Sequence, residues 1–146
     1  MKLKDFIFQN FTNVVVFDFE YSQPRGNNPK VVCCTFLELK SDKKFTHWYL
    51  DEIPQWPFKN NETIYICHNA VAEVSCMLEL GLERPNLIWD TMVQEKKLWL
   101  GREPGFSLLA ACNRYGINTI TEAQKEIYRN LIITKYPNYS AAEKEK

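Results

Sequence analysis

The sequence has no excess of charge of either sign and no long apolar run. Its 18 Lys and Arg residues balance its 18 Asp and Glu residues, which argues against a protein that binds nucleic acid through bulk positive charge. The longest apolar runs, residues 14–17 and 64–67, fall far short of the roughly 20 residues that cross a bilayer, so we expect no membrane partner. The first residues also lack a signal-peptide core of about 7–15 apolar residues. A nucleic-acid enzyme with a local site remains compatible with these absences.

Cysteine is present, but not in a pattern typical of zinc sites or disulfides. The five cysteines are an odd number, no C-x-x-C occurs, and only Cys67 and His68 place two metal-binding residue types side by side. The cysteines lie in apolar surroundings, where a free thiol packs as a small core residue. We therefore predict buried free thiols and a reducing, cytoplasmic location, in preference to a metal or redox role.

The length of 146 residues indicates a single domain over residues 1–146, which no repeat or linker divides. Strand patterns at 14–20, 31–39 and 45–50 precede an irregular segment at 53–58. They are followed by a strand at 63–67, a helix that begins at 70 and is stopped by Gly81, a strand at 87–89, and helices at 92–100, 106–115, 121–133 and 141–146. Short turns between the first strands predict an antiparallel three-strand meander, and the later strand–helix alternation predicts two parallel strands. The expected fold class is therefore α/β, a mixed sheet with flanking helices and its site at the carboxyl ends of the central strands.

Two acidic residues end the first strand. Asp18 and Glu20 are two apart, so their side chains project to the same face. Two like charges about 4 Å apart repel by about 4 kcal/mol at an effective dielectric constant near 20, so the pair calls for a positive group. Arg25 in the next loop or a divalent cation could supply it, and oxygen ligands favour Mg²⁺ or Mn²⁺ over zinc. Alternatively, both acids simply face water at the end of the strand.

A second cluster follows the strand at 63–67. His68 and Asn69 end that strand, and Glu73 lies in the first turn of the next helix. If the two strands are neighbours, Glu73 reaches the same end of the sheet as Asp18 and Glu20, and three carboxylates converge on a metal. The alternatives are structural: Glu73 complements the helix dipole, Asn69 caps the helix, and His68 is a partly buried residue at the end of the strand and not a general base.

These motifs, together with Trp89-Asp90-Thr91-Met92, resemble the DnaQ-like (DEDD) 3′–5′ exonucleases, most closely the proofreading-type domains of phage and family A DNA polymerases. The resemblance extends from about Phe11 to the C-terminus and implies an RNase H-like fold. It implies that Asp18, Glu20 and Glu73 are catalytic and bind the metals, although Glu73 stands where the family usually has Asp. Asp90 matches a family aspartate that we interpret as the structural cap of the next helix.

The family completes its site with an Asp on a late helix, preceded four residues earlier by Tyr or His. This chain has no Asp after Asp90. Tyr139 and Glu143 have the right spacing, but Ser140 to Glu143 is typical of a helix start, so we do not assign them to the site. We therefore expect a chain that is C-terminally incomplete.

The resemblance implies two-metal hydrolysis of DNA or RNA from a single-stranded 3′ end to 5′-mononucleotides, with Mg²⁺ or Mn²⁺ as cofactor. Without the last acid, we expect weak metal binding and slow hydrolysis. A polymerase or a complementing C-terminal fragment is the expected protein partner. Candidate contacts to the strand are Tyr21, Arg25, Lys30, Trp99 and Arg102. The alternatives are a non-catalytic RNase H-like module that binds nucleic acid or protein, and a structural domain whose acids are solvated.

Overall fold

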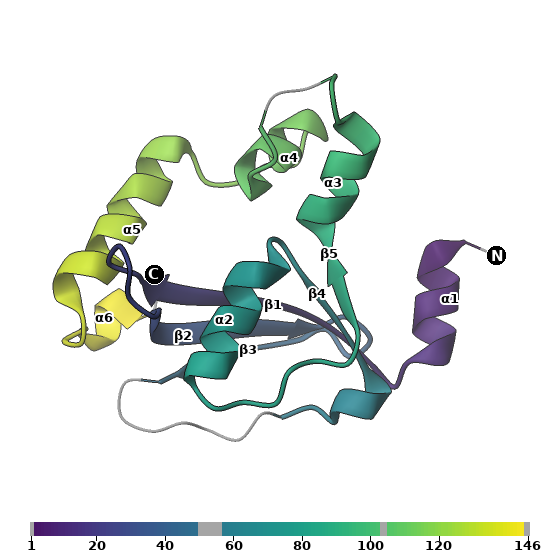
Figure 1. The fold of residues 1–146 in the computed structure, drawn as a ribbon, viewed down its shortest axis with the longest axis horizontal. Helices are drawn as coiled ribbons and strands as arrows, with labels where there is room; N and C mark the ends of the chain where they lie inside the picture. Colours follow the sequence, from purple (N-terminus) through teal and green to yellow (C-terminus); the bar gives the residue numbers. More distant parts are fainter. Residues whose placement is uncertain (1, 50–56, 103–104, 145–146) are drawn as a thin grey trace.

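The computed structural model describes residues 2–49, 57–102 and 105–144 (Figure 1). The strands are β1 (Asn13–Ser22), β2 (Lys30–Glu38), β3 (Lys43–Trp48), β4 (Thr63–Cys67) and β5 (Ile88–Asp90). The helices are α1 (Leu3–Asn10), α2 (Ala70–Glu79), α3 (Thr91–Trp99), α4 (Leu108–Arg114), α5 (Glu122–Lys135) and α6 (Ala141–Lys144), with a 3-10 turn at Asn60–Glu62. In the described part of the chain, no helix combines the length and the apolar character that crossing a membrane requires.

The five strands form one sheet in the order β3-β2-β1-β4-β5. The pairs β1–β2 and β2–β3 are antiparallel, and the pairs β1–β4 and β4–β5 are parallel. This confirms the predicted three-strand meander joined to two parallel strands. β1 is therefore the central strand, paired on one side with the meander and on the other with the strand–helix units.

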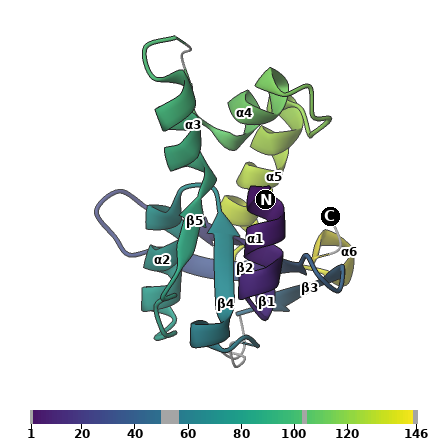
Figure 2. The same cartoon turned by 90° about the vertical axis from the view of Figure 1, so that its right-hand side faces the viewer.

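Alternation along β1 separates the apolar core from the acidic residues. Val15, Phe17 and Phe19 are buried on the face that α2 covers, where Cys76 and Met77 belong to the same core cluster. Figure 2 shows α2 on one side of the sheet and α1 and α5 on the other. The second face begins apolar under α1 and becomes acidic toward the carboxyl end of β1, where both acids are exposed. The prediction of an apolar strand with an acidic end is confirmed.

Helix α1 was not predicted, and the expectation that the fold begins with β1 is wrong. The helix has only one buried residue, Ile7, which packs with Val14 and Ile64 on the second face of the sheet. Leu3, Phe6 and Ile7 have the spacing of a helix, but this pattern extends over little more than one turn and follows Lys2, a poor N-cap residue, so the helix was missed. The other elements differ from prediction by a few residues at their ends, while predictions for residues 50 and 53–56 lie outside the described residues.

The cysteines behave as predicted from the sequence. All five thiols are free, and all but Cys112 are buried. Burial raises the pKa of Cys33, Cys67 and Cys76 to about 12, so these thiols remain protonated in the core.

Candidate active site

The Asp18–Glu20 pair lies where β1 continues beyond the end of its parallel neighbour. The last β1–β4 pair in register is Val16 with Ile66, so both acids follow the point at which β4 leaves the ladder. Their side chains are exposed on the face opposite α2. The structure thus confirms that the two carboxylates share one face at the carboxyl end of the central strand.

The electrostatics of the pair favour the uptake of positive charge. Although both side chains are accessible to water, the surrounding protein desolvates their carboxyls and raises both pKa values, with that of Glu20 reaching about 7. The negative charge of Asp18 raises the pKa of Glu20 further, and protonated Glu20 donates a hydrogen bond to Asp18. Lys125 of α5 lowers the pKa of Glu20, and His68 lowers that of Asp18. A proton shared by two acids marks a place that a divalent cation would fill.

Glu73 lies beside the pair, but its carboxylate has a structural role as well. The side chain is 4% exposed, and its Oε2 accepts a hydrogen bond of 2.8 Å from the backbone N–H of Phe19. That N–H lies beyond the last β1–β4 pair, so Glu73 replaces the acceptor that β4 no longer supplies. Desolvation and the charges of Asp18 and Glu20 raise the pKa of Glu73 to about 8, against the effect of the Phe19 hydrogen bond.

The structure therefore brings Asp18 and Glu20 together and places Glu73 next to them, directed at the backbone of β1. Among the residues that the structure describes, no three Asp, Glu, His or Cys side chains are gathered closely enough to hold a metal ion as they stand. Two carboxylates on one exposed face are nevertheless a donor set suited to a hard cation such as Mg²⁺ or Mn²⁺. The accessible carboxylates of Asp18 and Glu20 therefore fit such a cation as ligands, whereas Glu73 would have to share its carboxylate with the Phe19 N–H.

Asp90 caps two helices at once, which confirms its structural interpretation. Its carboxylate accepts hydrogen bonds from Met92 N and Val93 N at the start of α3 and from Asn69 N and Ala70 N at the start of α2. Desolvation would raise the pKa of Asp90, but the four N–H donors lower it overall. Asn69, with φ of 77°, occupies the N-cap position of α2, and its side chain makes no cap bond. The sequence predicts only the cap of α3, since nothing in it shows that the starts of α2 and α3 meet.

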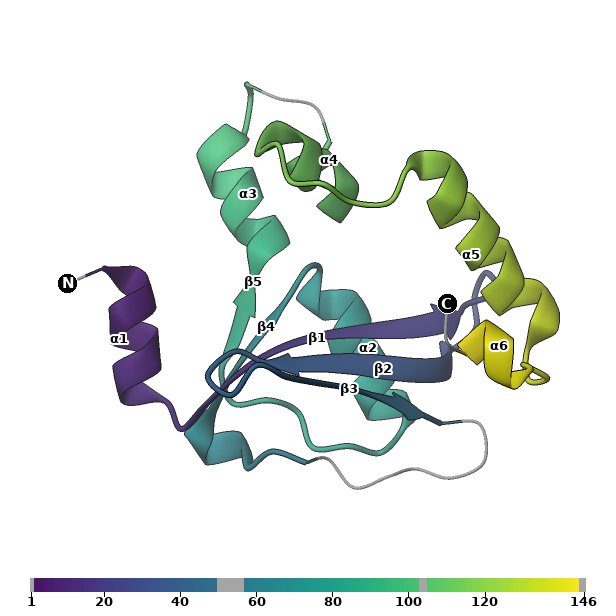
Figure 3. The same ribbon diagram turned by 180° about the vertical axis from the view of Figure 1, so that it is seen from behind.

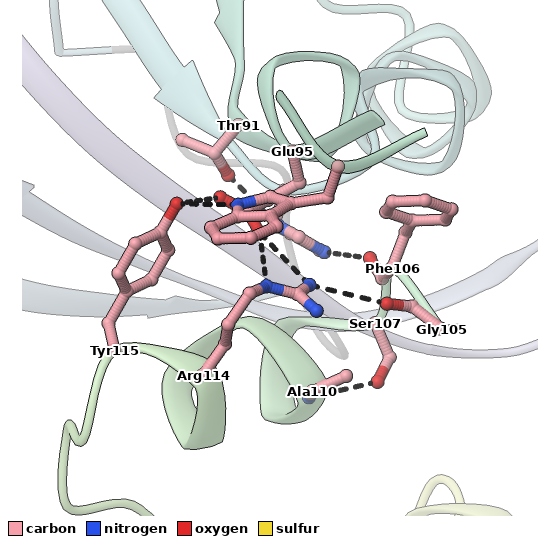
Figure 4. A network of polar contacts seen from close by, with 10 residues as sticks. Thr91, Glu95, Gly105, Phe106, Ser107, Ala110, Arg114 and Tyr115 are labelled. Carbon is pink, nitrogen blue, oxygen red and sulfur yellow. Dashed lines mark hydrogen bonds and ion pairs between the residues drawn. The ribbon is translucent and has the colours of Figure 1, made fainter. Parts of the chain in front are cut away.

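His68 is held by hydrogen bonds on both sides of its ring. Nε2 lies 2.8 Å from the carbonyl oxygen of Phe106 and must donate to it, while Nδ1 lies 2.9 Å from Thr91 Oγ1. The Phe106 carbonyl and Thr91 belong to the network in Figure 4. This arrangement supports the structural alternative for His68, because a ring engaged on both nitrogens is not free to act as a general base. No sequence signal connects His68 with a residue 38 positions later.

A buried ion pair fastens α4 to α3 and was not predicted. Arg114 donates to Glu95 Oε2 from Nη2 at 3.0 Å and from Nε at 3.1 Å, and the side chains are only 11% and 9% exposed. Tyr115 donates to Glu95 Oε1 at 2.8 Å, and the Arg114 guanidinium lies 5.5 Å from the centre of the Trp99 ring (Figure 4). The same Arg114 donates to the Gly105 carbonyl. Trp99, a candidate nucleic-acid contact, is thus a component of this helix-to-helix contact.

Comparison with known proteins places the fold. No protein-family model and no curated protein matches the sequence. Among solved structures, RNase D of Escherichia coli, described as an exoribonuclease involved in structured RNA processing, is similar at a TM-score of 0.66 and 13% identity. The match covers 90% of this chain and 34% of RNase D, so the chain spans about a third of that protein. The Nibbler exonuclease domain of Aedes aegypti is similar over 96% of this chain and 73% of its own, at a TM-score of 0.48 and 8% identity.

The fold is RNase H-like. The mixed sheet and its flanking helices match the architecture predicted from the sequence and that of RNase D. At 13% identity the similarity is one of fold, and it leaves the specific likeness to phage and polymerase proofreading domains a prediction.

Replacing Glu73 should separate its structural role from its charge. We expect Glu73→Ala to lower the free energy of unfolding by about 1–3 kcal/mol, because it leaves the Phe19 N–H without its acceptor. Glu73→Gln keeps a carbonyl acceptor and should cost less than about 1 kcal/mol. Urea unfolding measures both, and Glu79→Ala, an exposed position of the same helix, should cost no more than about 0.5 kcal/mol. Equal stability of the Ala and Gln variants would show that the Phe19 bond contributes nothing.

Stability should fall as the pH rises when no divalent metal is present. Folding raises the pKa of Glu20 to about 7 and that of Glu73 to about 8 from an ordinary 4.5, so the folded protein binds more protons than the unfolded chain between these values. The stabilising contribution is complete below about pH 4.5 and is lost as the pH rises through 7 to 8. We expect the melting temperature in EDTA to drop by several degrees from about pH 5 to about pH 9. A Glu20→Gln/Glu73→Gln variant should flatten this slope, and an unchanged slope would contradict the assignment.

Proposed function

We propose that this domain is a 3′–5′ exonuclease-like hydrolase that cleaves phosphodiester bonds of DNA or RNA to 5′-mononucleotides. The observation that carries the proposal is the Asp18–Glu20 pair, exposed at the open end of the central strand of an RNase H-like sheet, with Glu73 beside it. The likeness in fold to RNase D, an exoribonuclease by its description, supports the same class of activity.

In this proposal the carboxylates of Asp18, Glu20 and Glu73 hold Mg²⁺ or Mn²⁺. When bound, such ions lower the pKa of a water nucleophile and stabilise the oxygen that leaves. Asp18 and Glu20 offer the accessible oxygens, and β1 orients both to the face where a strand can approach. Glu73 keeps the end of β1 in place through Phe19, and a bound cation would displace the proton that its carboxyl holds up to about pH 8.

We further propose that Asp18, Glu20 and Glu73 alone hydrolyse a strand slowly, and that a protein partner, either a polymerase or a complementing C-terminal fragment, supplies a further carboxylate. Glu143, four residues after Tyr139, does not provide this carboxylate, because its Oε2 accepts hydrogen bonds from the backbone N–H and the hydroxyl of Ser140 at the start of α6. Tyr139 in turn donates its hydroxyl proton to the Ile132 carbonyl. Both side chains are therefore engaged in holding the end of the described chain.

A second candidate is a non-catalytic RNase H-like module that binds nucleic acid or protein. The observation that favours it is the hydrogen bond from Phe19 to Glu73, which engages the third acid in the backbone of β1 and leaves two carboxylates on the exposed face.

The experiment is a trimming assay on 5′-labelled single strands of matched DNA and RNA. We expect stepwise shortening from the 3′ end with Mn²⁺ or Mg²⁺ and none with EDTA. The cation is required both to offset the repulsion between the acids and to activate the water. A strand with a blocked 3′ terminus is the matched control and should persist. Calorimetry with Mn²⁺ decides between the two candidates: a folded protein that neither binds Mn²⁺ nor trims either strand is the non-catalytic module.

A further inference from the structure

A row of polar side chains crosses the sheet on the face that carries Asp18. Thr35 of β2 is directly opposite Asp18, and Thr46 of β3 is directly opposite Thr35. Because residues paired in register project to the same face, these side chains form a row about two strand spacings, or ~10 Å, in length. Lys44 lies two residues before Thr46 on β3 and therefore shares that face. We refer to Thr35, Thr46 and Lys44 as the polar row.

The polar row is open while the regions beside it are covered. Thr46 and Lys44 are exposed, and Thr35 is half-buried. At one end of the face α1 covers the apolar residues of the second core cluster, and at the other the Trp48 ring lies 5.8 Å from the ring of Tyr139. Figure 3, the view of the molecule from behind, looks onto this face. β2 and β3 lie there between α1 and α6, and no helix of the described chain crosses them. The row thus leads over uncovered sheet from β3 to the Asp18–Glu20 pair.

The chemistry of the row suits the backbone of a nucleic acid. The two threonine hydroxyls lie 2.9 Å apart, and whichever of them accepts the mutual hydrogen bond keeps its own proton for another acceptor. A hydroxyl donor and an ammonium group are the side-chain types that contact phosphates and sugars. A cross-strand threonine pair also stabilises a sheet by roughly 0.2–1 kcal/mol, but that role needs neither exposure nor a neighbouring lysine.

We infer that the polar row is a binding track for the backbone of a single-stranded nucleic acid that ends at Asp18. The direction of the strand rests on the proposed function: the 3′ end lies at the carboxylates, the preceding nucleotides lie over Thr35 and Thr46, and Lys44 pairs with a phosphate. The acidic pair is not a favourable contact for a phosphate without a cation, so the donors of the row supply the attraction along the strand.

The test measures binding without hydrolysis, by fluorescence anisotropy of labelled DNA and RNA strands of about ten nucleotides on a parent protein carrying Asp18→Asn. We expect Thr35→Val/Thr46→Val to weaken binding about fivefold. Lys44→Gln should weaken binding by a similar factor and reduce the slope of log affinity against log salt by about 0.7, the value for one contact to a single strand. Lys43→Gln is the matched control, because the adjacent exposed lysine projects to the opposite face, and it should change neither quantity.

Equal losses for DNA and RNA would identify the phosphates as the contacted groups, and a larger loss for RNA would identify the 2′-hydroxyl. Absence of oligonucleotide binding, unchanged binding in both row variants, or an equal loss with Lys43→Gln would overturn the track. Unfolding curves verify that the variants fold. If the threonine double variant does not fold, the comparison of Lys44→Gln with Lys43→Gln decides whether the track exists. If the row variants weaken binding but the protein with Asp18 intact never hydrolyses a strand, the proposed function is overturned and the track stands. If the protein trims strands with metal but the row variants bind normally, the track is overturned and the proposed function stands.

Discussion

Replacing Asp18 with Asn is expected to reduce metal-dependent trimming of a single strand by about 10²–10³-fold, which corresponds to roughly 3–4 kcal/mol in the activation barrier. The substitution keeps the size of the side chain and removes the negative charge that a cation requires. It also removes the negative charge that repels Glu20, while the amide oxygen can still accept from protonated Glu20, so stability should not fall and the loss should belong to activity. Single-turnover trimming rates at saturating Mn²⁺ measure the effect.

Asp42→Asn is the matched control for this experiment. Asp42 lies in the turn between β2 and β3 with φ of 56°, a left-handed conformation that Asn adopts as readily as Asp. The same chemical change away from the carboxylate pair should leave trimming within about twofold of the parent rate. Trimming that survives Asp18→Asn as well as Asp42→Asn would remove Asp18 from the site and point to a contaminating nuclease or to other ligands.

Replacing Arg114 with Met is expected to produce the largest loss of stability, about 3–5 kcal/mol. The substitution leaves the Glu95 carboxylate 9% exposed without its cation, and it removes the contact with the Trp99 ring. Tyr115 still donates to Glu95, but a neutral donor does not offset the desolvated charge. Urea unfolding at neutral pH measures the change.

Two comparisons test the origin of that loss. Lys59→Met disrupts an exposed pair, Lys59 with Glu62 at 3.8 Å, and should cost less than about 1 kcal/mol. Replacing both members of the buried pair, as Glu95→Leu/Arg114→Met, should recover much of the stability, because no unpaired charge remains. If the double variant is no more stable than Arg114→Met, the loss comes from packing of α4 on α3 and not from the stranded carboxylate.

The parts of the fold that were predictable are those in which local pattern and topology agree. Three segments each carry their own sequence signal. They are the buried β-branched strand that ends in two acids, the Thr63–Cys67 strand that a helix follows at once, and the helix that begins after Asp90. Short turns and helical crossovers then leave few ways to assemble the sheet. The positions of Asp18 and Glu20 on one face follow from the two-residue period of a strand alone.

The parts that were not predictable depend on contacts between distant segments. Asp90 serves two helices because their starts converge, and His68 is held by a carbonyl 38 residues later. Lys125 acts on Glu20 only because α5 lies against β1, as Figure 1 shows. Glu73 illustrates the same limit: its place near the acids follows from topology, but its bond to Phe19 depends on where β4 leaves the ladder.

The Phe19 amide has a practical use that follows from this bond. The Phe19 N–H donates to Glu73 Oε2, and a cation bound to Glu73 would change the electron density on that oxygen. In an ¹⁵N-labelled sample, this single cross-peak should move early in a Mn²⁺-free Mg²⁺ titration, and its hydrogen-exchange protection should change with it. The Phe19 amide of β1 is therefore a spectroscopic reporter of whether Glu73 takes part in binding the ion, and it requires no nuclease assay.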